Sequence, residues 1–390
     1  MIKLTFNRHA AHRADISGYG METARKARAF HSSIPGYAPT PLRALGCLAE
    51  SLGVKGIYLK DESMRFELNA FKVLGGSFAI GSHIASLMGE DISAMPYERM
   101  TGAEVKNTLG EQCFVTATDG NHGRGVAWTA NKLKQKSVVY MPEGTAAERL
   151  ENIRRLGAEA DITDATYDDC VRRAARDAEK NGWLLVQDTS WPGYERIPGL
   201  IMQGYTTMAL EAVEQLGDEI PTHVFLQAGV GSMAAAVAAF LANYYGERRP
   251  KIIIVEPHTA DCHYLTVAAD DGKLHPISGG MSSMMAGLCC GEPCPIAWEI
   301  LSDYGDAFAS IPDSASARAM RTLARPLGSD AHTVSGESGA AGMGLALALL
   351  TDEENRELKK ALGIDESSVL LCFSTEGDTD RENYKKILEE

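Results

Sequence analysis

The feature that most constrains the fold is a regular alternation of strand-like and helix-like segments from residue 112 to residue 190. QCFVTAT, SVVYMP, AEADIT and WLLVQD are short apolar runs of the kind found in buried strands. Between them lie HGRGVAWTANKL, AAERLENIRRLG and YDDCVRRAARDAEKNG, which have helical periodicity. This alternation predicts a parallel sheet covered by helices on both faces.

A second series of the same kind follows. Residues 200–216 and SMAAAVAAFLANYYG are helix-like, whereas THVFLQAG, KIIIVEP and SSVLLCFSTEG are strand-like. With 390 residues the chain exceeds one ordinary core, so two domains are expected. We predict an α/β fold of two doubly wound domains with the active site in the cleft between them. The predicted large domain comprises residues 1–84 and 195–390, and the predicted small domain comprises residues 85–194.

Composition and charge exclude several classes of function. The net charge of −14 argues against nucleic acids and anionic membranes as partners. No apolar run approaches the ~20 residues that span a bilayer, and the N-terminus has no signal-peptide core, so a cytoplasmic enzyme is expected. The eight cysteines fit reduced thiols, and their spacing does not suggest a metal site.

Lys72 is the first candidate catalytic residue. It lies between apolar residues in NAFKVLGG, has no adjacent carboxylate, and precedes a segment of helical periodicity. Burying an ammonium without a partner is costly, but a desolvated amine is a good nucleophile and can form a Schiff base. The alternative is a surface lysine at the start of a helix.

A glycine loop follows the strand THVFLQA and comprises Gly229, Val230, Gly231, Ser232 and Met233. Glycines allow close approach of a ligand, and the N-terminus of the next helix favours an anion such as phosphate. The same residues match the dinucleotide pattern GxGxxG/A, and Glu256 ends the next strand where a ribose-binding acid would lie. Phosphate binding, NAD binding and a turn without ligand all remain open on this segment alone.

Two further strand ends carry polar residues. Thr118, Asp119, Gly120 and Asn121 form a strand-to-helix turn that could bind a carboxylate or a phenolic oxygen, although a helix cap needs the same residue types. Ser374 ends the strand VLLCF, where a hydroxyl could bond a ring nitrogen, although a polar loop is the simpler reading.

Taken in order, NAFKVLGG, DGNHG, GVGSM and STEGDTD resemble the fold type II pyridoxal-phosphate enzymes of the tryptophan synthase β and threonine dehydratase superfamily. The resemblance covers essentially the whole chain. It implies that Lys72 forms the internal aldimine, that Asn121 contacts the phenolic oxygen, that residues 229–233 hold the phosphate and that Ser374 lies at the pyridine nitrogen.

Within that superfamily the chain is most similar to the diaminopropionate ammonia-lyases, through RFELNAFKVLGG, TATDGNHGRGVAW, QDTSWPGYERIP, MAGLCCGEP, SGESGA and STEGDTD. This resemblance implies conversion of D- and L-2,3-diaminopropionate to pyruvate and two ammonia by a homodimer, with Asp119 and Asp188 in acid–base roles. Two carboxylates also suit a diamine substrate, because a carboxylate attracts the β-ammonium. Thr118, Asp119, Gly120 and Asp188 are the predicted substrate-binding residues.

Three competing functions stay open. A dehydratase of the serine and threonine type, or a lyase of another β-substituted alanine, would use the same cofactor. An NAD-linked oxidoreductase would use the glycine loop and Glu256 but leaves Lys72, Asn121 and Ser374 without a role. A non-catalytic ligand-binding regulator on the same fold would not need the lysine.

Overall fold

The computed structural model describes residues 1–118 and 120–390. Contacts within the chain divide it into two compact units. The first unit comprises Met1–Met21, Pro39–Ala70 and Met208–Glu390, and the second comprises Glu22–Ala38 and Phe71–Thr207. The long helix α9 (Arg196–Leu216) contributes residues to both.

The first unit is built on a seven-stranded mixed sheet. Its four central pairings, from β10 through β9, β8 and β11 to β3, are parallel, and an antiparallel strand closes each edge. In spatial order the strands are β1 (Lys3–Phe6), β10 (Ala307–Ile311), β9 (Lys251–Pro257), β8 (His223–Gln227), β11 (Val369–Ser374), β3 (Gly56–Asp61) and β2 (Leu42–Ala44). The β8, β10 and β11 strands are buried at every residue, as expected for strands covered on both faces.

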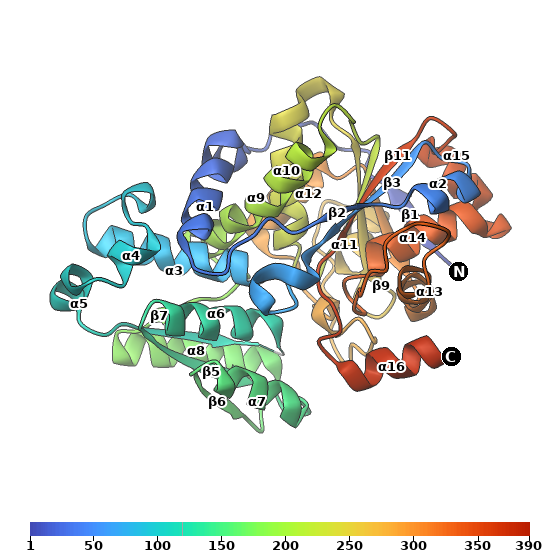
Figure 1. Cartoon of the computed structure of the whole chain (residues 1–390). Helices are drawn as coiled ribbons and strands as arrows, with labels where there is room; N and C mark the ends of the chain where they lie inside the picture. The colour runs from blue at the N-terminus through green and yellow to red at the C-terminus, as the bar shows by residue number, and fades with distance from the viewer. Residues whose placement is uncertain (119) are drawn as a thin grey trace. The chain divides into compact units, whose positions relative to one another are not determined.

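Helices of the first unit bury small and apolar side chains against this sheet. Every residue from Ala341 to Leu349 is buried in α14, which packs on β8 and β11, with α13 beside it (Figure 1). The helices are α2 (Gly46–Leu52), α10 (Ser232–Tyr245), α11 (Cys262–Ala269), α12 (Pro295–Tyr304), α13 (Asp313–Ala324), α14 (Ala341–Thr351), α15 (Arg356–Leu362) and α16 (Arg381–Glu389).

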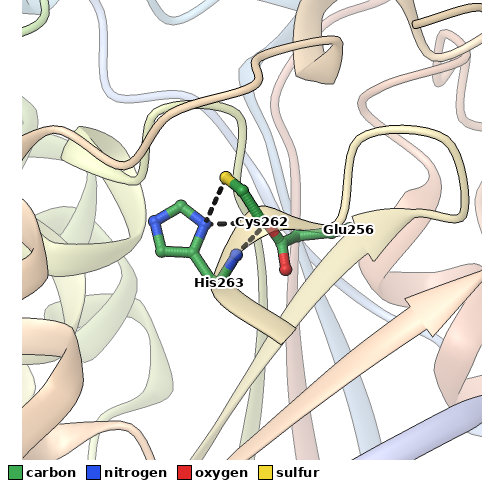
Figure 2. Close-up of side chains that lie close together, drawn as sticks. All are labelled: Glu256, Cys262 and His263. Atoms are coloured by element: carbon green, nitrogen blue, oxygen red, sulfur yellow. Dashed lines mark hydrogen bonds and ion pairs between the residues drawn. The ribbon is translucent and has the colours of Figure 1, made fainter. Parts of the chain in front are cut away.

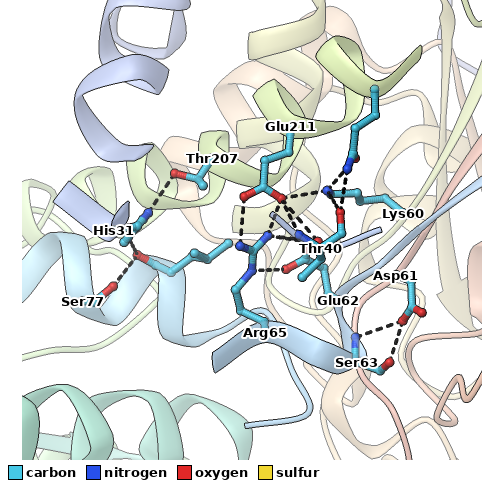
Figure 3. Close-up of polar contacts among 12 residues, drawn as sticks. His31, Thr40, Lys60, Asp61, Glu62, Ser63, Arg65, Ser77, Thr207 and Glu211 are labelled. Carbon is cyan, nitrogen blue, oxygen red and sulfur yellow. Dashed lines mark hydrogen bonds and ion pairs between the residues drawn. The ribbon is translucent and has the colours of Figure 1, made fainter. Parts of the chain in front are cut away.

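A fully buried ionic cluster joins three segments of the first unit (Figure 3). Lys60 on β3 donates to Glu211 on α9 at 2.7 Å. Arg65, in the short helix η2 (Glu62–Glu67), donates to Glu211 and to Glu62, and Thr40 hydrogen-bonds to both carboxylates. Burial acts to lower the pKa of Lys60, and the neighbouring carboxylates offset part of that shift. Lys60 is therefore paired with a carboxylate that a distant helix supplies.

The second unit has a four-stranded, fully parallel sheet. Its strands, in spatial order, are β6 (Glu159–Ile162), β5 (Lys136–Met141), β4 (Cys113–Ala117) and β7 (Leu184–Leu185). Its helices are α1 (Met21–Ser33), α3 (Val73–Leu87), α4 (Tyr97–Met100), α5 (Ala103–Leu109), α6 (Asn121–Lys132), α7 (Ala147–Arg155) and α8 (Tyr167–Asn181). The alternation seen in residues 112–190 thus forms β4, α6, β5, α7, β6, α8 and β7 in that order.

The predicted α/β fold with two sheets is confirmed, and two details differ. WLLVQD forms only the two-residue strand β7, and the rest continues as loop. Residues 22–38, 71–84 and 195–207 were predicted in the large domain, but they group with the second unit, where α3 packs closely on α6. Among the described residues, no helix has the length and apolar character needed to cross a membrane.

Candidate active site

Lys72 and Asp188 form an ion pair in the second unit. Lys72 immediately precedes α3, and its Nζ donates to Oδ2 of Asp188, which follows β7. The Lys72 side chain is 22% exposed and that of Asp188 is 8% exposed. The apolar sequence neighbours of Lys72 predicted a buried side chain, but the side chain is partly exposed. Lys72 also has a carboxylate partner 116 residues away in the sequence.

The surroundings of Asp188 keep it ionised. Burial by itself would raise the pKa of Asp188. The charges of Lys72 and His122 and the hydrogen bond from Lys72 outweigh burial and hold the pKa below its ordinary value. His122 Nδ1 lies 3.9 Å from Asp188 Oδ2, and its Nε2 donates to the carbonyl of Val186 at 2.8 Å. This bond ties the start of α6 to the loop that carries Asp188.

Aromatic residues line the other side of the lysine. The ring centroid of Phe71 lies 5.5 Å from Lys72 Nζ and 4.8 Å from the ring of Tyr205. Tyr205 is fully buried, its hydroxyl has no hydrogen-bond partner among the described residues, and burial raises its pKa. Tyr205 could not be predicted from the sequence, because it lies in a helical segment without a motif.

The turn before α6 carries two of the predicted substrate-binding residues, Thr118 and Gly120. Thr118 is buried and its Oγ1 accepts from the Gly120 amide at 3.0 Å, while Asn121 begins α6. Asp119 lies outside the described residues. Further along α6, a Cβ on Gly125 would lie 3.0 Å from the backbone of Val73 and 3.2 Å from the carbonyl carbon of Lys72. A glycine at this position lets α6 approach the lysine backbone closely.

The predicted glycine loop lies in the first unit, between β8 and α10. Gly231 is the N-cap of α10 with φ = +96°, a backbone conformation that residues other than glycine rarely adopt. A Cβ on Gly229 would lie 3.0 Å from Cys290 Sγ and 3.2 Å from the Gly287 carbonyl. Ser232 and Met233 form the first turn of the helix. The local geometry is the predicted strand–glycine turn–helix.

Ser374 ends β11 and is fully buried. Its Oγ donates to Oγ of Ser335 at 2.7 Å. Glu376, two residues further on, is also held in place: its Oε1 accepts from the Ser338 amide at 3.0 Å, and its carbonyl accepts from the Gly336 amide at 2.8 Å. The motifs SGESGA and STEGDTD are therefore interlocked, a contact that sequence reasoning missed.

The predicted site residues divide between the two units. Lys72, Thr118, Gly120, Asn121 and Asp188 belong to the second unit, where the structure brings Lys72 and Asp188 into contact. The loop 229–233 and Ser374 belong to the first unit.

Glu256 does not have the environment expected of a ribose-binding acid. It is fully buried at the end of β9, and its carboxylate accepts from the amides of His263 and Tyr264 at the start of α11 and bonds to His263 Nδ1 (Figure 2). With Cys262 and His263 it forms a trio whose potential ligand atoms lie within 4.8 Å of one another. The carboxylate is already used by these hydrogen bonds, so the trio does not change the prediction of no metal.

Comparisons with known proteins agree along the whole chain. Residues 34–371 match the family described as pyridoxal-phosphate dependent enzyme. Diaminopropionate ammonia-lyase of Salmonella typhimurium is 49% identical over 92% of this chain and 90% of its own length. The enzyme of that name from Escherichia coli K12 is 47% identical over 95% of this chain and 92% of its own.

Solved structures give the same answer. Holo diaminopropionate ammonia lyase from Escherichia coli superimposes with a TM-score of 0.93 at 44% identity, over 100% of this chain and 96% of that chain. The same enzyme in complex with an aminoacrylate-PLP azomethine reaction intermediate gives a TM-score of 0.92 over 100% and 97%. With its strand–glycine turn–helix and its Lys72–Asp188 pair, this chain belongs to the pyridoxal-phosphate-dependent enzymes and, among them, to the diaminopropionate ammonia-lyase family.

Proposed function

We propose that this chain is a pyridoxal-phosphate-dependent lyase that converts 2,3-diaminopropionate and water to pyruvate and two ammonia, and that it accepts both the D and L isomers. The observation that carries this proposal is the ion pair of Lys72 with Asp188 in a chain 49% identical to a diaminopropionate ammonia-lyase. A carboxylate beside the lysine suits a substrate with a second ammonium group.

Pyridoxal phosphate fits the donors that the chain offers. The glycine loop presents backbone without side chains at the start of the 14-residue helix α10, whose dipole favours a phosphate. Lys72 supplies the amine, and we assign Asn121 to the phenolic oxygen and Ser374 to the pyridine nitrogen. When bound, the cofactor supplies an electron sink for the carbon that loses its proton.

Lys72 acts first as the anchor of the cofactor and then as a base. Once the substrate amine has displaced it, Nζ of Lys72 removes the Cα proton of the L isomer. We assign the corresponding proton of the D isomer to Asp119, on the opposite face of the substrate. Asp119 and Asp188 thus have different tasks.

Asp188 acts as a fixed negative charge. Its lowered pKa leaves it without a proton at neutral pH, so it is better suited to hold a cation than to act as an acid. A carboxylate close to the β-amine keeps that amine in its ammonium form. The Cβ–N bond can then break with neutral ammonia as leaving group, and the remaining unsaturated amine is hydrolysed to pyruvate and the second ammonia.

The deciding experiment measures pyruvate released by the purified holoenzyme from D- and L-2,3-diaminopropionate, and separately from serine, threonine and a β-chlorinated alanine. The proposal expects the highest kcat/KM for diaminopropionate. A higher kcat/KM for serine or threonine would instead support the dehydratase alternative. Borohydride reduces a Schiff base and abolishes its absorbance band. Loss of such a band on treatment with borohydride would therefore separate either lyase from an NAD-linked enzyme.

We further propose a cytoplasmic homodimer, on the expectations drawn from the cysteine content and the resemblance. Light scattering on the purified protein at several concentrations tests the dimer, and a monomeric mass throughout would contradict it.

A further inference from the structure

A buried histidine lies against the glycine loop of the first unit. His263 is the second residue of α11 and is fully buried, with its ring 5.8 Å from that of Trp298. A Cβ placed on Gly231 would lie 2.7 Å from His263 Nε2. The imidazole thus occupies the space that a side chain at position 231 would need, which is a second reason for glycine there.

Glu256 fixes the orientation and the tautomer of this ring. Oε1 of Glu256 lies 2.7 Å from His263 Nδ1 and 3.0 Å from the His263 amide, and Oε2 accepts from the Tyr264 amide at 2.8 Å. A carboxylate only accepts hydrogen bonds, so Nδ1 must carry the proton. The carboxylate also caps the N-terminus of α11, where a negative charge is favoured.

The other ring nitrogen faces the loop without a partner. Nε2 of His263 is buried and has no hydrogen-bond partner among the described residues. Cδ1 of Leu301 lies 3.0 Å from the same Cβ position on Gly231, so the side chain next to Nε2 at this position is apolar. Leaving a buried polar atom unpaired is costly, and a fold that needed only volume here could use an apolar residue. The Glu256–His263 pair is instead arranged like a carboxylate that orients an imidazole for a ligand.

We propose that His263 is a phosphate-positioning residue, oriented by Glu256, whose Nε2 hydrogen-bonds to the phosphate group held at the glycine loop. The proposal deepens the function stated above and rests on its cofactor. A hydrogen bond between Nε2 and a phosphate oxygen, with the shared proton on either partner, would satisfy the unpaired nitrogen.

Two variants with amide side chains distinguish the contribution of Nδ1 from that of Nε2. The side-chain amide of His263→Asn can replace Nδ1 as donor to Glu256 but cannot reach the place of Nε2, whereas that of His263→Gln can reach the place of Nε2. The affinity of each apoenzyme is measured for pyridoxal 5′-phosphate and for pyridoxal, which lacks the phosphate. The proposal expects His263→Asn to weaken binding of pyridoxal 5′-phosphate about 10- to 100-fold while leaving pyridoxal binding unchanged. His263→Gln should keep most of the affinity for both.

Other patterns overturn the proposal. If His263→Asn weakens both ligands by the same factor, or neither, the histidine only supports the packing of the loop. A larger phosphate-specific loss in His263→Gln than in His263→Asn would mean that the bond to Glu256 is what matters. His223→Asn is the matched control, because His223 is also buried but bonds Thr222 and Leu362 through its two nitrogens. It should show no phosphate-specific loss.

A measurement on the unmodified protein covers the case in which the variants do not fold. In wild-type apoenzyme labelled with ¹⁵N-histidine, a buried Nε2 resonance should shift on addition of pyridoxal 5′-phosphate and not of pyridoxal. Identical spectra with the two ligands would overturn the proposal. All these measurements use cofactor without substrate. A chain that shows the phosphate-specific effect but releases no pyruvate from diaminopropionate would therefore refute the proposed function and leave this inference intact.

Discussion

At the scale of single residues, two lysines show that burial alone does not identify the functional amine. Lys60 is fully buried, yet it is enclosed by Glu211, the Thr40 carbonyl and Gln215. Lys72 is partly exposed and has one carboxylate beside it. The buried lysine holds the fold together, whereas the partly exposed one can still reach a ligand.

Replacing Asp188 by Asn should impair catalysis more than folding. We expect kcat/KM for diaminopropionate to fall roughly 100-fold or more, because the β-ammonium and Lys72 lose their counter-charge. The lowered pKa of Asp188 also sets a pH dependence of stability. The pair stabilises fully above the unfolded pKa of about 4 and progressively less as pH falls towards the lower folded pKa, so wild type and variant should converge in acid.

Steady-state kinetics and thermal unfolding at pH 7 and pH 3 check this prediction. Asp177→Asn is the control, since Asp177 bonds Tyr140 in the same unit. Unchanged kcat/KM in Asp188→Asn would contradict the role given to this residue.

Glu337 should make the protein less stable as pH rises from about 4.5 towards 7. Burial, with the nearby charges of Glu376 and Asp380, raises the pKa of Glu337 to about 7, against a hydrogen bond from Asn383. A raised acid pKa means that the folded state keeps the proton between about pH 4.5 and 7 while the unfolded chain loses it, so stability falls across that window by about 3 kcal/mol.

Glu337→Gln removes this titration and can keep the bond from Asn383. Urea unfolding measures the free energy of unfolding of both proteins at pH 5 and pH 8. The difference, variant minus wild type, should increase by about 1–3 kcal/mol between the two pH values. A constant difference would show that Glu337 does not titrate there.

At the scale of elements, the position of Lys72 depends on how closely α6 packs on the start of α3. Gly125 permits this approach, because a Cβ there would meet the backbone of Val73 and Lys72 at 3.0–3.2 Å. Backbone atoms cannot move aside as a flexible side chain can. The lysine is therefore located by a helix pair and not only by its own segment.

Gly125→Ala should displace the lysine backbone. We expect a loss of about 1–3 kcal/mol from overpacking, which exceeds the gain of up to about 1 kcal/mol in helix propensity, together with a reduced kcat. Thermal unfolding and kinetics measure the two effects. Gly199→Ala in α9 is the control: nothing lies within 4 Å of its Cβ position, so it should be neutral or stabilising. Equal effects of the two substitutions would refute this explanation.

At the scale of the whole molecule, the buried ionic cluster ties together distant parts of the first unit. The single carboxylate of Glu211 accepts hydrogen bonds from Lys60, Arg65 and Thr40 (Figure 3). Removing one partner from a buried ion pair leaves the remaining charge without a counter-charge. The resulting loss of stability is larger than the stability that the intact pair adds relative to apolar residues in its place.

Glu211→Gln should therefore destabilise the protein by about 3–5 kcal/mol. The exposed pair of Lys55 and Glu219, 2.8 Å apart, provides the control, and Glu219→Gln should cost less than about 1 kcal/mol. Urea unfolding of the two variants compares them. Similar losses would mean that the cluster contributes no more than a surface pair.

The sequence by itself determined the α/β class, the order of most strands and helices, and the family. Periodicity and glycine turns are local properties, so they can be recognised without the fold. Lys72, the loop 229–233 and Ser374 could be predicted as site residues because each lies in a short contiguous motif. Asp188 was predicted by resemblance, since nothing near it in sequence marks it as the partner of a lysine.

The tertiary structure decided which of these residues meet. The pairing of Lys72 with Asp188, of Lys60 with Glu211, and of the Glu256–His263 pair with Gly231 depends on strand order and helix packing. These contacts join residues from 7 to 151 positions apart. Side-chain chemistry is local to a residue, but its pKa, its partner and its use are set by whichever distant segment the fold places beside it.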